Sequence, residues 1–133
     1  MSKTLYKGLT IVLLIFIFSN SLLSADVSSA QSGFFVSIVL SILDWFHINI
    51  DMDTLSLIIR KIAHFLEFFA LGFSIAKGWG MKFFIHLSII LLIASLDESI
   101  QLFSNGRAFS VIDIGIDTCG GITGWMLSRR LSK

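Results

Sequence analysis

The chain has 133 residues, of which 55% are hydrophobic and only 14% are charged, and its formal net charge is +1. This is not the composition of an ordinary soluble domain, in which about a quarter of the residues are charged. Together with a mean hydropathy of +0.88, it predicts a single integral membrane domain over residues 1–133, with the lipid bilayer as its main partner and no nucleic-acid partner.

The first apolar stretch, residues 8–24, follows Lys3 and Lys7 and predicts a first spanning helix. A basic start, a short apolar core and the small residues Ser28 and Ala30 also fit a secretory signal peptide. The rest of the chain would remain a membrane protein after cleavage, so we favour an uncleaved span.

A second apolar stretch, residues 34–48, is short for a span. It follows the polar segment 28–33, in which Ser32 is a plausible N-cap, and Trp45 near its end suits the headgroup region. We expect an amphipathic or re-entrant helix here on the outer side. Asp53 is expected to cap the helix that follows.

Three further spans are predicted at residues 55–76, 83–103 and 111–128. The sequence therefore predicts an all-α integral membrane bundle of four transmembrane helices, with the additional helix between the first and second spans.

The charges are distributed unequally over the two sides of this bundle. Arg60, Lys61 and Arg107 fall on one side together with all nine acids. Basic residues mark the cytoplasmic side, so both termini are expected there. The residues on that side are Lys3, Lys7, Lys77, Lys82, Arg129, Arg130 and Lys133.

The outer ends of three predicted spans carry ionisable groups that a hydrophobic helix normally lacks. Arg60, His64 and Glu67 are spaced i, i+4, i+7 and share one helix face. Because charges are costly inside a bilayer, such residues normally face a bundle interior, a partner or a water-filled cavity. We predict one outward-facing ligand-binding cluster formed by Arg60, Lys61, His64, Glu67, Asp97, Glu98, Gln101, Arg107, Asp113 and Asp117.

Three interpretations of this cluster stay open. A structural salt-bridge network would pair Arg60 with Asp97, or Lys61 with Glu98. A binding site would use its cations for phosphate or carboxylate groups and its acids for an amine. Catalysis, or a divalent metal site, would need imidazole and carboxylate groups. The candidates for that role are His64, Glu67, Asp97, Glu98 and Asp113.

Two local patterns bear on the last span. Ser110-x-x-Asp113 fits a capping box, which competes with a site role for Asp113, whereas Asp117 lies one turn deeper, where capping does not explain it. Small residues allow helices to approach closely, within the bundle or between protomers. The small residues here are Gly120, Gly121 and Gly124.

The order and spacing of these residues resemble the VanZ-like family. The matching motifs are Arg60-Lys61-x-x-His64-x-x-Glu67, Asp97-Glu98-x-x-Gln101, Gly106-Arg107 and Asp113-x-x-x-Asp117-x-x-Gly120. Family members are small bacterial membrane proteins, named after a teicoplanin-resistance protein. Asp117 and Phe68 depart from the pattern, where Asn and Tyr are expected, and the additional acid alters any affinity for metal or protons.

The resemblance implies a multi-pass protein of the bacterial cytoplasmic membrane and a link to antibiotic resistance, but no biochemical activity. We therefore expect the cluster to bind a lipid headgroup, a lipid-linked wall precursor, or a glycopeptide or lipopeptide antibiotic. A membrane-embedded enzyme acting on a lipid-linked substrate and a structural or adaptor protein are the alternatives. Whether a divalent metal serves as cofactor and how many protomers assemble stay open.

Overall fold

The computed structural model describes residues 2–47 and 50–132, and this part of the chain forms five helices and no strand. The all-α prediction is confirmed. Residue 48, the predicted end of the second helix, and Lys133 lie outside the described residues. The helices are α1 (Lys3–Ser21), α2 (Ala25–Trp45), α3 (Met52–Trp79), α4 (Phe83–Gln101) and α5 (Val111–Arg130).

Four helices begin at a residue whose side-chain oxygen accepts a backbone N–H three positions later, which satisfies a donor that the helix itself leaves unpaired. These N-cap residues are Ser2, Ser24, Asp51 and Ser110. At the other end of α3, Gly80 adopts a left-handed conformation with φ 64°, and its N–H bonds to Ala76. Glycine suits this terminator because it has no Cβ to clash.

Two predicted helix starts are wrong. Ser32 does not begin the second helix, because Ser24 caps it and the polar segment 28–33 continues the helix. Polar residues without a proline do not interrupt helical hydrogen bonding. Asp51 rather than Asp53 caps α3, and Asp53 lies in the first turn, where its charge complements the helix dipole.

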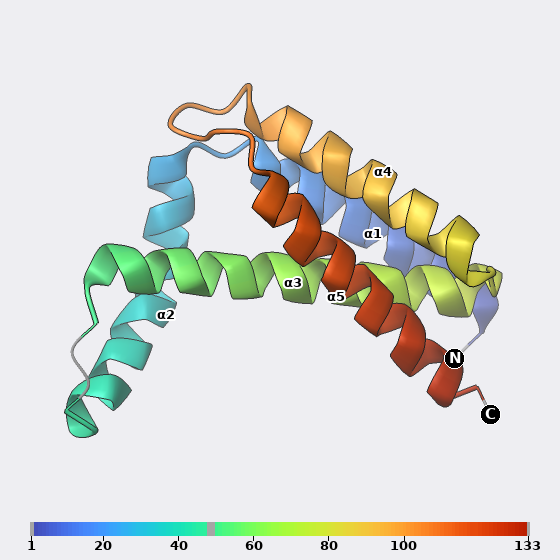
Figure 1. Ribbon diagram of the computed structural model, residues 1–133, viewed down its shortest axis with the longest axis horizontal. Coiled ribbons are helices and arrows are strands. Elements are labelled where there is room, and N and C mark those ends of the chain that lie inside the picture. The colour runs from blue at the N-terminus through green and yellow to red at the C-terminus, as the bar shows by residue number, and fades with distance from the viewer. Residues whose placement is uncertain (1, 48–49, 133) are drawn as a thin grey trace.

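The long helix α3 is the centre of the fold and contacts all four other helices (Figure 1). α1 and α4 lie along one side of α3, and α5 crosses it. α2 crosses the N-terminal part of α3, and the two chain ends lie together at the C-terminal end of α3. The molecule therefore has two distinct ends joined by four packed helices.

The hydrophobic core lies between α1, α3 and α4. It contains Ile17, Phe68, Leu71, Ile75, Ile90, Ile93 and Ala94. Large apolar side chains also cover the outside, including Phe84 with 78% of its surface exposed. Within the described residues, α1 and α4 are long and apolar enough to cross a membrane.

Glycines let α3 and α5 approach backbone to backbone. A Cβ at Gly124 would lie 2.2 Å from the Phe69 carbonyl oxygen, and one at Gly72 would lie 2.2 Å from the Gly121 carbonyl oxygen. The predicted close helix approach is therefore present, and it occurs within the bundle. It also brings the polar residues of α3 and α5 within reach of each other.

Candidate functional site

The polar residues gather at the end of the bundle away from the chain termini, where α1 and α4 end and α5 begins. α3 contributes from the middle of its length, since its N-terminal half continues towards α2 (Figure 1). The structure brings the following predicted residues into this region: Arg60, Lys61, His64, Glu67, Asp97, Glu98, Gln101, Arg107, Asp113 and Asp117. Their role in binding stays a prediction.

The centre of the region is formed by His64, Asp97 and Asp117, one residue from each of α3, α4 and α5. Each can offer one ligand atom so that the three atoms lie within 4.8 Å of one another. The distance from His64 Nδ1 to Asp117 Oδ1 is 3.6 Å. Both carboxylates are fully buried, and the histidine side chain is 14% exposed.

Asp97 is held by two neighbours. The hydroxyl group of Ser21 contacts its Oδ1, and Gln101 Nε2 donates a 3.0 Å hydrogen bond to its Oδ2. The Gln101 contact follows from the i, i+4 spacing on α4. Ser104 in turn donates to the backbone carbonyl of Ser21 over 2.7 Å, which fixes the end of α1 against the end of α4.

Asp117, in contrast, is not held by hydrogen bonds: neither of its carboxylate oxygens has a hydrogen-bond partner among the described residues. His64 Nδ1 also lacks one. Four other carboxylates lie near enough to repel the charge of Asp117. They are Asp97, Glu98, Asp113 and Glu67.

Glu98 caps the start of α5 from a neighbouring helix. Its Oε2 accepts the Ser110 backbone N–H at 2.7 Å, while the Ser110 hydroxyl group accepts the Asp113 N–H at 3.2 Å. The predicted capping box is thus only half correct: Ser110 accepts the Asp113 N–H as expected, but the carboxylate that accepts the Ser110 N–H belongs to Glu98 on α4 rather than to Asp113. The other carboxylate oxygen of Glu98 has no hydrogen-bond partner in the described part of the chain.

Asp113 is free for a different contact and forms an ion pair with Lys61. The predicted pairing of Lys61 with Glu98 is therefore wrong. The side chain of Lys61 is 41% exposed and that of Asp113 is 23% exposed, so this pair lies at the rim of the cluster.

Sequence reasoning missed the contribution of α1. Asn20 Nδ2 donates to Glu67 over 3.3 Å, and Ser21 contacts Asp97. The signal was the polar run Ser19-Asn20-Ser21 at the end of an otherwise apolar helix. Polar residues are also common at ordinary helix ends, so this run alone does not predict a contact with the cluster.

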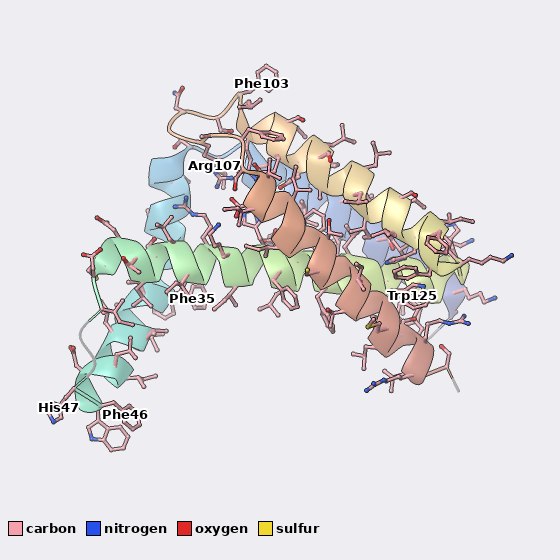
Figure 2. All side chains as sticks on the ribbon, in the orientation of Figure 1. Phe35, Phe46, His47, Phe103, Arg107 and Trp125 are labelled. Atoms are coloured by element: carbon pink, nitrogen blue, oxygen red, sulfur yellow. The ribbon has the colours of Figure 1, made fainter. Side chains whose placement is uncertain are left out.

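Arg107 lies on the loop between α4 and α5, near the start of α5 (Figure 2). It is close enough to Arg60, Glu67, Asp97 and Glu98 to interact with their charges. Burial lowers the pKa of Arg107 below its usual value, and the positive charge of Arg60 lowers it further. The three nearby carboxylates oppose this shift, so the guanidinium group remains a cation where the loop meets the cluster.

The charges of the described cluster do not balance. Three cations, Arg60, Lys61 and Arg107, face five carboxylates. The carboxylates are Glu67, Asp97, Glu98, Asp113 and Asp117. A ligand that brings positive charge into the centre would be favoured electrostatically.

The opposite end of the bundle has a different character. Lys77 donates to Ser132 over 2.8 Å, and the Lys7 ammonium group lies 5.4 Å from the Trp79 ring centroid. His86 is buried, with Nε2 3.3 Å from the Gly121 carbonyl oxygen and its ring beside Trp125. His86 is therefore a packed residue.

An apolar groove of about 600 Å³ lies on the outside of α3 and α5, away from the polar cluster. Its lining is Phe69, Thr123, Trp125, Met126, Leu127, Arg129 and Arg130. Figure 2 shows Trp125 near the C-terminal end of α5.

The comparison with known proteins agrees with the motif pattern. The model of the VanZ/LLP1 family matches residues 8–132, which is nearly the whole chain. No curated protein and no solved structure matches this chain. On the extent of the family match, the chain belongs to the VanZ/LLP1 family.

Proposed function

We propose that this chain is a four-span protein of the bacterial cytoplasmic membrane that binds the headgroup of an amphiphilic ligand in the outer half of the membrane. The ligand is a lipid, a lipid-linked wall precursor, or a glycopeptide or lipopeptide antibiotic. Binding contributes to antibiotic resistance, in keeping with the family to which the chain belongs.

The arrangement of the helices supports four spans with both termini in the cytoplasm. α1, α4 and α5 have 19 or 20 residues, which corresponds to about 28–30 Å, the thickness of the hydrocarbon core. Lys7 lies beside Trp79, and Lys77 donates to Ser132, just beyond the last turn of α5 that carries Arg129 and Arg130. Basic residues of α1, α3 and α5 therefore share one end. The positive-inside rule assigns that end to the cytoplasm.

α1 behaves as part of the bundle rather than as a removable signal. Ile17 belongs to the core, and Ser21 contacts a buried carboxylate of the cluster. Removal of α1 would leave that carboxylate without one of its partners, at a considerable energetic cost.

α2 suits the membrane interface. Phe34, Phe35 and Trp45 are exposed along this helix, and Phe46 and His47 project from its end (Figure 2). Aromatic side chains prefer the headgroup region, and a helix that packs mainly against one end of α3 does not need to cross the bilayer.

One observation carries the binding proposal: buried polar atoms of the cluster have no partner within the described residues. These atoms are His64 Nδ1, Glu98 Oε1, Arg107 Nε and both carboxylate oxygens of Asp117. A network that serves assembly alone is stable when every buried charge is satisfied. Unused hydrogen-bonding capacity at five atoms of four residues favours a ligand over a purely structural role.

The test is ligand-dependent thermal stability of the purified protein in detergent. The probes are phosphatidylethanolamine, the undecaprenyl-linked disaccharide-pentapeptide wall precursor and teicoplanin, each added separately. Each carries an amino group that suits the excess of carboxylates in the cluster. We expect at least one probe to raise the Tm of the wild type and of Asp44→Asn, which removes an exposed carboxylate on α2, but not that of Arg107→Gln, which removes a cation of the cluster. Equal Tm values with and without all three probes would contradict the proposal.

A further inference from the structure

We infer that His64, Asp97 and Asp117 form a site for one divalent metal ion, with Zn²⁺ or Mn²⁺ as the fitting ions. This inference adds a cofactor to the ligand site proposed above, but it rests on separate observations and is tested without the amphiphile.

Geometry is the first support. The three residues come from three different helices, and their ligand atoms lie within 4.8 Å of one another. Metal–ligand bonds of about 2.0–2.1 Å in a tetrahedral site place neighbouring ligand atoms about 3.3 Å apart. The 3.6 Å between His64 Nδ1 and Asp117 Oδ1 is near that spacing and is longer than a hydrogen bond between these atoms.

The second support is the unused capacity of Asp117. Its side chain is fully buried, and within the described part of the chain neither carboxylate oxygen has a hydrogen-bond partner. Buried charges are normally paired or bound to a metal. His64 Nδ1, which has no hydrogen-bond partner among the described residues, lies 3.6 Å from one of these oxygens, so a single ion between them would satisfy both groups.

The surroundings of Asp97 are those of an oriented metal ligand. Ser21 and Gln101 each hold one of its oxygens, which fixes the plane of the carboxylate while leaving a lone pair on each oxygen. Outer hydrogen bonds of this kind position metal ligands in known sites. Asp97 is thus held in place, while Asp117 and His64 keep free atoms for the ion.

Charge gives the third support. The described cluster holds five carboxylates against three cations, so its formal charge is −2 with neutral histidine. One divalent ion makes the sum zero. In a membrane-embedded site this compensation is worth more than at a water-exposed surface.

The ligand set selects the kind of ion. Imidazole suits Zn²⁺ and other transition metals, and carboxylates suit Mn²⁺, whereas Ca²⁺ requires six to eight oxygens. Three protein ligands leave at least one coordination position open. The open position is available to water or to an anionic oxygen of the bound headgroup.

The experiment uses the full chain with a Strep tag, in phosphatidylcholine nanodiscs treated with EDTA and then desalted. Isothermal titration with ZnCl₂ and MnCl₂ is expected to show one ion per chain for the wild type. Asp117→Asn and His64→Gln should bind at least 10-fold more weakly, because each replaces a carboxylate or imidazole ligand by a neutral amide. Asp44→Asn, which removes an exposed carboxylate outside the cluster, should bind like the wild type.

Absence of wild-type binding to both ions, or unchanged affinity in Asp117→Asn, would overturn the inference. If the variants fail to fold, the wild type alone decides: bound Co²⁺ must show a visible spectrum of nitrogen and oxygen ligation, and a spectrum of aqueous Co²⁺ rejects the site. Metal binding without any amphiphile-dependent Tm shift would leave the site standing and remove the proposed function. The opposite pair of results would remove only the metal.

Discussion

The hydroxyl group of Ser21, the last residue of α1, contacts Oδ1 of Asp97 on α4, although the two residues are 76 positions apart. Asp97 is fully buried, so this contact is part of how its carboxylate is accommodated inside the bundle. It makes the end of the first helix a structural part of the polar cluster.

Ser21→Ala should therefore destabilise the protein. Loss of the hydroxyl group leaves one oxygen of a buried carboxylate unpaired, which costs about 1–3 kcal/mol in the free energy of unfolding. Reversible denaturation in detergent measures the change. Ser19→Ala is the matched control, because Ser19 is exposed on the same helix, and equal stability of the two variants would contradict this role of Ser21.

Gly124→Ala tests the close approach of α3 and α5. The new Cβ would lie 2.2 Å from the Phe69 carbonyl oxygen and 2.7 Å from the Phe73 amide nitrogen, and these backbone atoms cannot move without separating the helices. We expect the free energy of unfolding to fall by about 1–3 kcal/mol, which is visible as a lower Tm.

The control for that experiment is Gly115→Ala on the same helix. Nothing lies within 4 Å of a Cβ at Gly115, so the substitution adds helix propensity without a clash. It should leave the Tm unchanged or raise it, by up to about 1 kcal/mol in stability. A Tm for Gly124→Ala as high as that of Gly115→Ala would mean that the helices need no close contact.

The sequence was sufficient to predict the helices and the gathering of charges at one end. Long apolar stretches report on helices directly, and the positions of Arg60, Asp97 and Asp117 near one boundary are properties of the linear chain. The start of a helix depends on a single N-cap residue, and several serines lie in this region. The sequence pattern therefore does not show whether Ser24 or Ser32 caps α2.

Individual contacts were harder to predict than the cluster. Lys61 pairs with Asp113 rather than Glu98 because the glycine-mediated crossing of α5 over α3 sets which residues face each other. That crossing depends on helix rotation, which the sequence does not specify. Asn20 and Ser21 were missed for the same reason, since a polar helix end shows its partner only after packing.

The ion pair between Lys61 and Asp113 should contribute little to stability. Both side chains are partly exposed, and ion pairs of this kind contribute about 1 kcal/mol or less to the free energy of unfolding. A double-mutant cycle with Lys61→Gln and Asp113→Asn, measured by unfolding in detergent, tests this. A coupling several times larger would favour a structural role for the rim charges over a role in ligand binding.

The proposed membrane topology predicts opposite accessibility for the two ends of α4. In a Cys119→Ser background, Asn105→Cys in the exposed loop between α4 and α5, which the proposed orientation places outside, should react with a membrane-impermeant maleimide in intact spheroplasts. Lys82→Cys, exposed before α4, should react only after permeabilisation. Labelling of Lys82→Cys in intact spheroplasts would reverse the proposed orientation.

Arg107 connects the cluster to the proposed phenotype, because its guanidinium group comes from the loop between α4 and α5 and interacts with Asp97, Glu98 and Glu67. Arg107→Gln removes a cation suited to phosphate or carboxylate recognition but keeps a long polar side chain. In a susceptible strain that gains teicoplanin tolerance from the wild-type protein, this variant should lose the gain at equal membrane abundance. Arg130→Gln, an exposed cation at the opposite end, should keep it. Equal tolerance in both variants would show that recognition does not use Arg107, and loss in both would point to overall positive charge rather than to the cluster.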